Sequence, residues 1–206
     1  MSRVRIKFCG LTRADDAATA ARLGADAIGV VFYPPSSRAV TLEQARAVID
    51  ALPAFVTVAA LFLDPERDEV ERVLKTLPID LLQFHGDESP AFCESFERPY
   101  IKALPMAGDV DLNAAARDYR HARGLLLDAH ARGESGGQGK TFNWRHVELP
   151  LPVVLAGGLS PGNVGRAIET VRPWAVDVSS GVESGPGIKS HERMAAFVAE
   201  VNRAGN

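Results

Sequence analysis

Cysteine is scarce in this chain of 206 residues, which contains only Cys9 and Cys93. The two lie far apart, and neither belongs to a C-x-x-C pair or to a Cys/His set with zinc-ligand spacing. The sequence therefore argues against a zinc site and against a disulfide framework. Two isolated thiols are typical of a reducing compartment, so we expect a cytoplasmic protein.

Long apolar runs and blocks of one charge are also missing. No segment approaches the roughly 18 apolar residues of a membrane span, and the first residues, MSRVRIKF, lack the apolar core of a secretory signal. We therefore expect no membrane partner. The formal net charge is −3 and no basic block occurs, so nucleic acid is not an expected partner either.

Short apolar runs alternate with segments of helical period along the whole chain. The apolar runs predict eight strands, over 4–9, 26–32, 56–62, 80–84, 100–103, 124–128, 152–156 and 175–179. Several intervening segments carry one apolar stripe, which is typical of helices that pack on a sheet. No linker or second-domain boundary is visible, so residues 1–206 are expected to form one domain.

Helix starts are predicted at three places by capping residues. Thr41 with Gln44 has the form of a capping box. Asp64-Pro65 and Ser160-Pro161 each combine an N-cap residue with proline at the first helical position. The sixth helix should be short, because FNWRHVEL (142–149) leaves room for two turns at most.

Eight βα units in succession predict an α/β fold with parallel strands. Two closures are compatible with this order: a (βα)8 TIM barrel and an open, doubly wound sheet. The count of eight favours the barrel. In that fold the active site is built at the carboxyl ends of the strands, so the residues there are the candidates for chemistry.

Two turns rich in glycine and serine stand at the last two strand ends. Gly157 and Gly158 follow the seventh strand in LAGGLSPGN, and Ser180 and Gly181 follow the eighth in DVSSGVE. Bare backbone N–H groups and helix N-termini bind anions, and these two loops are the usual phosphate site of the barrel. Tight turns alone would also favour glycine at these positions. We favour a phosphate site because the two turns follow the seventh and eighth strands, the units whose loops bind phosphate in this fold.

The segment 133–141, GESGGQGKT, resembles a nucleotide-binding loop, but its spacing is wrong. The G-x-x-x-x-G-K-T pattern needs glycine at position 134, which is Glu134. We interpret residues 130–141 as a loop over the barrel mouth, either a lid with Lys140 reaching inward or a plain surface loop.

Cys9 and Asp128 are the candidates for acid–base chemistry. Cys9 ends the first strand, where a thiolate could act as nucleophile or base, and His85 is a candidate partner for a nucleophile. Cys93 reads instead as a buried helix residue. Asp128 ends the otherwise apolar strand GLLLDA, where loss of hydration would raise its pKa. A thiol and a carboxyl group on one rim can move protons on a sugar phosphate with no metal and no redox cofactor.

Seven motifs in order carry a family resemblance. They are KFCGLT, FYPPSSRAV, LQFHG, LLLDA, GGQGKTFNW, LAGGLSPGNV and DVSSGVESGPGIK. This set closely resembles the phosphoribosylanthranilate isomerase family of tryptophan biosynthesis. The resemblance implies a (βα)8 barrel without a cofactor. It also implies the Amadori rearrangement of N-(5-phosphoribosyl)anthranilate to 1-(2-carboxyphenylamino)-1-deoxyribulose 5-phosphate.

The resemblance also assigns roles to residues. Cys9 would be the general base that removes the C2 proton, and Asp128 the general acid that protonates the furanose oxygen. Arg38 would face the anthranilate carboxylate, and Asp177 the sugar hydroxyls. The other expected substrate contacts are Gln83 and His85, with the phosphate held by the backbone at Gly157, Gly158, Ser180 and Gly181.

Two other readings stay open at this point. A different phosphate-binding barrel, such as a pentose-phosphate epimerase, would bring metal-binding His and Asp residues to the strand ends. A binding module or thiol redox sensor would have a reactive Cys9 but no isomerase activity. The expected partner is a small sugar phosphate, and the chain is expected to be a monomer or a homodimer.

Overall fold

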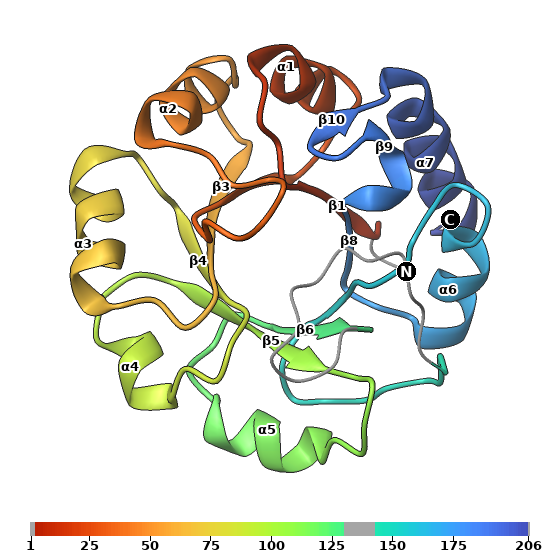
Figure 1. Ribbon diagram of the computed structural model, residues 1–206. Helices are drawn as coiled ribbons and strands as arrows, with labels where there is room; N and C mark the ends of the chain where they lie inside the picture. The colour runs from red at the N-terminus through yellow and green to blue at the C-terminus, as the bar shows by residue number, and fades with distance from the viewer. Residues whose placement is uncertain (1–2, 130–142, 206) are drawn as a thin grey trace.

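Eight parallel strands close into a barrel in the computed structural model, which describes residues 3–129 and 143–205 (Figure 1). The strands are β1 (Arg5–Cys9), β2 (Ala27–Val31), β3 (Thr57–Phe62), β4 (Leu81–Phe84), β5 (Tyr100–Pro105), β6 (Leu125–Asp128), β7 (Val153–Leu155) and β8 (Ala175–Val178). Because β1 pairs in parallel with both β2 and β8, the sheet has no edge. The predicted strands and barrel are confirmed, and the doubly wound alternative is wrong.

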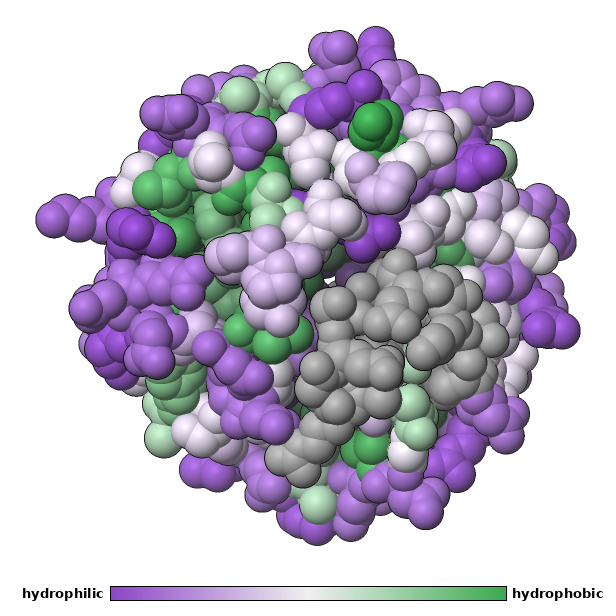
Figure 2. All heavy atoms as spheres, in the orientation of Figure 1, coloured by the Kyte–Doolittle hydropathy of each residue, from purple (hydrophilic) through white to green (hydrophobic). Residues whose placement is uncertain are grey.

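Helices surround the barrel and cover the outer side of its sheet (Figure 1). They are α1 (Ala14–Arg22), α2 (Leu42–Asp50), α3 (Arg67–Thr76), α4 (Pro90–Glu94), α5 (Leu112–Asp118), α6 (Val164–Val171) and α7 (His191–Ala204). Each longer helix buries one apolar stripe, such as Ala45, Val48 and Ile49 in α2. Hydrophilic side chains correspondingly cover most of the outer rim of the face shown in Figure 2.

The capping residues predicted at helix starts are confirmed at one place and wrong at two. Thr41 and Gln44 form the capping box of α2. Helix α3 begins only at Arg67, because Asp64 has a φ of 46° and its carboxylate accepts the backbone N–H of Asp87 in the neighbouring loop. Helix α6 likewise begins at Val164, since residues 161–163 form a turn after Ser160.

Two connections differ from the regular βα pattern. Between β6 and β7 the described residues, 143–152, contain no helix, so the short sixth helix is absent from that stretch. The predicted loop over the mouth, 130–141, lies outside the described residues. After β8 the chain forms a 3-10 turn, η1 (Ser180–Val182), and a small antiparallel hairpin of β9 (Glu183–Gly185) and β10 (Ile188–Lys189), which the sequence did not predict.

Side chains from the strands form two layers of core. The larger layer lies between sheet and helices and includes Phe8, Ile28 and Phe84, all fully buried. A second, smaller cluster fills the inside of the barrel, with Leu81, Ile101, Ala103, Leu126, Val154, Ala156 and Ala175. Other inward positions are polar yet buried, namely Lys7, Gln83, Asp128 and Asp177. Burying four polar side chains costs free energy, so this part of the barrel is built for something other than stability.

Candidate active site

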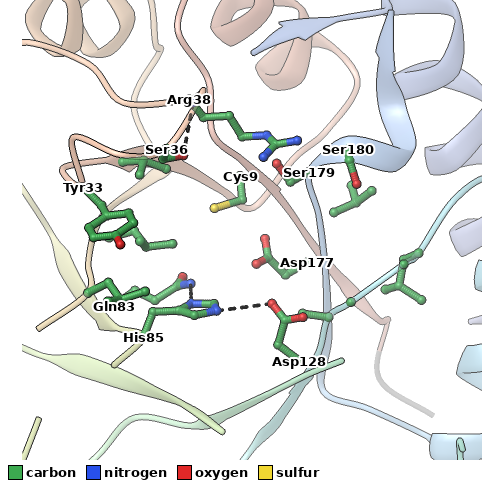
Figure 3. Close-up of a pocket in the computed structure, with 18 residues that line it drawn as sticks. Cys9, Tyr33, Ser36, Arg38, Gln83, His85, Asp128, Asp177, Ser179 and Ser180 are labelled. Carbon is green, nitrogen blue, oxygen red and sulfur yellow. Dashed lines mark hydrogen bonds and ion pairs between the residues drawn. The ribbon is translucent and has the colours of Figure 1, made fainter. Parts of the chain in front are cut away.

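A cavity opens at the carboxyl ends of the strands and contains most of the predicted site residues. Its lining includes Cys9, Arg38, Gln83, His85, Asp128, Gly157, Gly158, Asp177 and Ser180. The loops and strand ends of seven βα units contribute to it, as Figure 3 shows for the labelled side chains. Closure of the barrel thus brings residues from the whole length of the chain to one site.

Asp128 lies on one side of this cavity with His85. The imidazole Nε2 of His85 is 3.4 Å from Oδ2 of Asp128, and its Nδ1 is 3.3 Å from the amide nitrogen of Gln83 (Figure 3). All three side chains are buried, and Gln83 and His85 are neighbours on the inward face of β4 and its continuation. Asp128 at the end of β6, the predicted general acid, therefore lies next to the imidazole of His85, which directly follows β4.

Cys9 lies on the other side of the cavity, and only 6% of it is exposed. Burial raises the pKa of its thiol, while the ammonium group of Lys7 opposes that increase. Lys7 donates from Nζ to Oδ1 of Asp177 at 2.9 Å, and both side chains are buried. Asp177, predicted to contact sugar hydroxyls, therefore uses one carboxylate oxygen to hold Lys7 and points into the cavity between Cys9 and Asp128 (Figure 3).

Arg38 is fixed by a carboxylate that sequence reasoning missed. Its Nε and Nη2 donate to the two oxygens of Glu183 at 2.7 and 2.8 Å, and Lys189 donates to the same carboxylate at 2.8 Å. Hydrogen bonding to Glu183 raises the pKa of Arg38, and the pKa of Glu183 is lowered because the bonds from Arg38 and Lys189 outweigh its burial. A guanidinium held in this way presents a fixed planar cation to the cavity.

The two predicted phosphate turns meet at the mouth next to Asp128. Gly157 and Gly158 have φ values of 81° and 63°, a backbone conformation that favours glycine. A Cβ atom on Gly157 would collide with the backbone nitrogen of Ala129, and one on Gly181 with the carbonyl oxygen of Leu159. Gly181 therefore serves to pack the turn after β8 onto the turn after β7, whereas Gly157, Gly158 and Ser180 line the cavity.

Several residues in or near the cavity were not among the predicted site residues. Tyr33 and Ser179 line the cavity, while Lys7 and Glu183 support Cys9 and Arg38. The signal for Lys7 was present, because it precedes Cys9 by two positions on a strand and therefore lies on the same face. No comparable signal existed for Glu183, because its partner Arg38 lies 145 positions away in the chain.

The described residues were also searched for metal sites and membrane spans. Within 3–129 and 143–205 no group of three or more His, Cys, Asp or Glu side chains has an arrangement that could hold a metal ion. None of the helices in the same two segments is long and apolar enough to cross a membrane.

Comparison with known proteins agrees with this geometry. Residues 6–200 match the family model described as N-(5'phosphoribosyl)anthranilate (PRA) isomerase. The N-(5'-phosphoribosyl)anthranilate isomerase of Alcanivorax borkumensis is 54% identical, over 100% of this chain and 98% of the relative. That of Pseudomonas putida strain W619 is also 54% identical, over 99% of this chain and 100% of the relative.

Solved structures of similar proteins have the same fold. The phosphoribosyl anthranilate isomerase of Thermotoga maritima is 39% identical and superposes with a TM-score of 0.84, over 96% of this chain and 98% of that chain. A structure of the isomerase in complex with reduced 1-(o-carboxyphenylamino)-1-deoxyribulose 5-phosphate is 36% identical, with a TM-score of 0.81 and the same coverage. Because the family model matches residues 6–200 of the 206 in the sequence, this chain belongs to the N-(5'-phosphoribosyl)anthranilate isomerase family.

Proposed function

We propose that this chain isomerises N-(5-phosphoribosyl)anthranilate to 1-(2-carboxyphenylamino)-1-deoxyribulose 5-phosphate, in tryptophan biosynthesis, by general acid–base catalysis. The observation that carries the proposal is that Cys9 and Asp128 line one cavity together with residues of the turns after β7 and β8. The family match supports the substrate, and this arrangement supports Cys9 as base, Asp128 as acid and the two turns as phosphate site.

In the first step Asp128 acts as the general acid. Its carboxyl proton passes to the furanose ring oxygen, the bond from C1 to that oxygen breaks, and the amine lone pair forms a cationic imine at C1. His85, whose Nε2 lies 3.4 Å from Oδ2 of Asp128, helps to position the carboxyl group for this transfer. A positioned acid of this kind contributes about 10²–10⁴-fold to the rate.

In the second step Cys9 acts as the general base. Its thiolate takes the C2 proton, the C–H electron pair forms a double bond between C1 and C2, and the imine nitrogen becomes neutral. The resulting enolamine gains a proton at C1 and loses one from the C2 hydroxyl, which gives the ketone product. Return of one proton from the Cys9 thiol to the Asp128 carboxylate restores the enzyme, so the overall reaction is an isomerisation.

The two ends of the substrate have separate binding groups in this proposal. The phosphate is placed against the backbone of Gly157, Gly158 and the turn at Ser180, where N–H groups meet an anion. The anthranilate carboxylate is placed against Arg38, which Glu183 orients. Gln83, His85 and Asp177 then face the ribose between the two ends.

The cellular context of the protein is proposed on the same basis. We place the enzyme in the cytoplasm, as a monomer or a homodimer, with a sugar phosphate as its partner and neither nucleic acid nor membrane involved. One of the similar solved structures is described as mutually generated monomers of a dimeric isomerase, which supports considering both assembly states.

A coupled assay tests the proposed function directly. Freshly generated phosphoribosylanthranilate is supplied to the purified protein, and product is followed through the next enzyme. We expect turnover that added EDTA leaves unchanged and that inorganic phosphate at millimolar concentration inhibits competitively. Absence of turnover in a folded sample would contradict the proposal.

A further inference from the structure

Lys7 and Cys9 meet in a space that a missing side chain leaves open. They lie on the inward face of β1, opposite Gly29 of β2, which pairs with Cys9 in the sheet. A Cβ atom at Gly29 would come within 2.8 Å of the Cys9 sulfur and 3.1 Å of Nζ of Lys7. The sulfur and the ammonium nitrogen therefore lie close together, both next to the position that a side chain at residue 29 would occupy.

The charged groups around the Cys9 sulfur come from several elements. Lys7 of β1 and Asp177 of β8 have the largest electrostatic influence on it, and Arg38 of the β2–α2 loop and Lys189 of β10 also influence it. Arg38 and Lys189 both bind Glu183, so their positive charge is partly neutralised there. Lys7 is the cation with the largest effect on the thiol, and Asp177 holds its ammonium group beside Cys9.

We propose that Lys7 is a positioning residue for the acid–base reaction: its ammonium group stabilises the thiolate form of Cys9, and Asp177 fixes its location. The inference rests on the proposed function and deepens it. Cys9 loses and regains a proton during the reaction, whereas Lys7 stays an ammonium ion throughout. Gly29 makes the contact possible because any larger side chain there would displace the sulfur and the ammonium group.

The titration behaviour of both groups supports this assignment. Burial raises the pKa of Cys9, which disfavours the base form that the reaction needs, and Lys7 is the largest influence in the opposite direction. The pKa of Lys7 itself is raised to about 12, because its attraction to Asp177 and Cys9 outweighs the effect of burial. Lys7 therefore carries its charge at neutral pH.

The test measures the thiol without substrate, so its failure is distinguishable from failure of the proposed function. The rate of iodoacetamide alkylation of Cys9 is followed against pH by peptide mass spectrometry in the wild type and in Lys7→Met, Lys7→Arg and Asp177→Asn. Because the thiolate is the reactive form, an upward pKa shift of one unit lowers the rate about tenfold below the pKa. Alkylation of Cys93, which is fully buried outside the barrel, reports unfolding in the same samples.

We expect the two partners of one ion pair to shift the thiol in opposite directions. Lys7→Met should slow alkylation near neutral pH by at least about tenfold, and Asp177→Asn should move the profile to lower pH because it removes a nearby negative charge. Lys7→Arg, which keeps the charge, should stay near the wild-type profile. Lys102→Met is the matched control, since it breaks another buried lysine–carboxylate pair away from Cys9 and should leave the Cys9 profile unchanged.

The catalytic rate should change with the reactivity of the Cys9 thiol. In Lys7→Met, kcat near neutral pH should fall by at least about tenfold with KM little changed, and part of the loss should be recovered at higher pH. An unchanged Cys9 profile in folded Lys7→Met, or in folded Asp177→Asn, would overturn the proposal. If Lys7→Met does not fold, Lys7→Gln decides in its place: a Cys9 profile that stays at the wild-type position in that folded variant overturns the proposal.

Discussion

Two clusters in this protein contain the same three groups, a cysteine, a lysine and a carboxylate. Cys9, Lys7 and Asp177 lie inside the barrel at the cavity. Cys93 of α4 lies outside the barrel, with Lys102 and Glu88. Each lysine is buried and forms an ion pair of similar length, 2.9 Å with Asp177 and 3.2 Å with Glu88. Composition therefore does not separate a reactive cluster from a structural one.

The difference lies in what surrounds each lysine. Nζ of Lys102 also donates to the carbonyl oxygens of Gly86 at 2.6 Å and Ala103 at 3.1 Å, and the Glu88 carboxylate accepts backbone N–H groups of the β3–α3 and β4–α4 loops. These bonds tie loops together, and Cys93 is not among the residues that line the cavity at the strand ends. Burial raises the pKa of its thiol to about 12. The inner lysine instead faces a thiol that lines an open site, so it can influence chemistry there.

Loss of catalytic rate should distinguish Cys9 from Cys93. Cys9→Ala and Asp128→Asn should each lower kcat by about 10²–10⁴-fold or more, because each removes a group that moves a proton in the proposed reaction. The matched control is Cys93→Ala, which should retain kcat within about twofold because Cys93 touches neither substrate nor cavity. Near-normal turnover in Cys9→Ala would mean that the inner cluster is structural too.

Substitutions in the outer cluster should change the free energy of unfolding rather than kcat. Lys102→Met leaves the Glu88 carboxylate buried without its cation, which should lower the free energy of unfolding by about 3–5 kcal/mol. Urea unfolding measures the loss, and kcat of the remaining folded enzyme should stay near the wild-type value. The double variant Lys102→Met/Glu88→Met should recover most of the stability, since no unpaired charge remains. Equal destabilisation in the double variant would argue that the hydrogen bonds matter more than the charge.

Arg38 tests whether a buried ion pair at the cavity affects substrate binding while a similar pair elsewhere does not. Arg38→Met should raise KM for phosphoribosylanthranilate by about tenfold or more, because a charge-assisted pair with the substrate carboxylate is lost. An aniline analogue without that carboxylate should be much less affected. Arg13→Met is the matched control, because Arg13 forms a similar two-bond pair with Asp16 outside the cavity lining and should leave KM unchanged. Equal losses for both substrates would assign Arg38 to structure.

A smaller effect, on stability at low pH, is expected for Glu183 near the mouth of the cavity. The pKa of Glu183 is lowered from its ordinary 4.5, because its bonds to Arg38 and Lys189 outweigh burial. A lowered pKa contributes stability above the unfolded value, and this contribution is lost as the pH falls through the folded value. Glu183→Gln should therefore be less stable than wild type near pH 7, and the gap should shrink below about pH 4.

Urea unfolding at both pH values measures this gap. The exposed Glu148 is the control, and Glu148→Gln should match wild type at either pH. A gap for Glu183→Gln that stays constant between the two pH values would contradict the assignment of Glu183 as the charged partner of Arg38.

Local sequence signals were sufficient to predict the order of the strands and the residues at their ends. Alternating apolar runs mark all eight barrel strands to within about two residues, and chain order alone places Cys9, Asp128 and the Gly157–Gly158 turn at carboxyl ends. These signals are local, because strand period and turn chemistry depend on neighbours in the chain. The exceptions are Asp64 and Ser160, where good capping residues were used for turns instead.

Two features became known only from the closed barrel: which face of each strand meets the cavity, and which distant groups meet there. Lys7 and Lys102 are both single lysines in apolar strands, but a period of two defines two faces without saying which lies inside. Closure of β1 onto β8 sets Lys7 opposite Asp177, and the hairpin after β8 brings Glu183 to Arg38. Such long-range pairs leave no local signal, because their free energy depends on burial and charge that exist only once the barrel has closed.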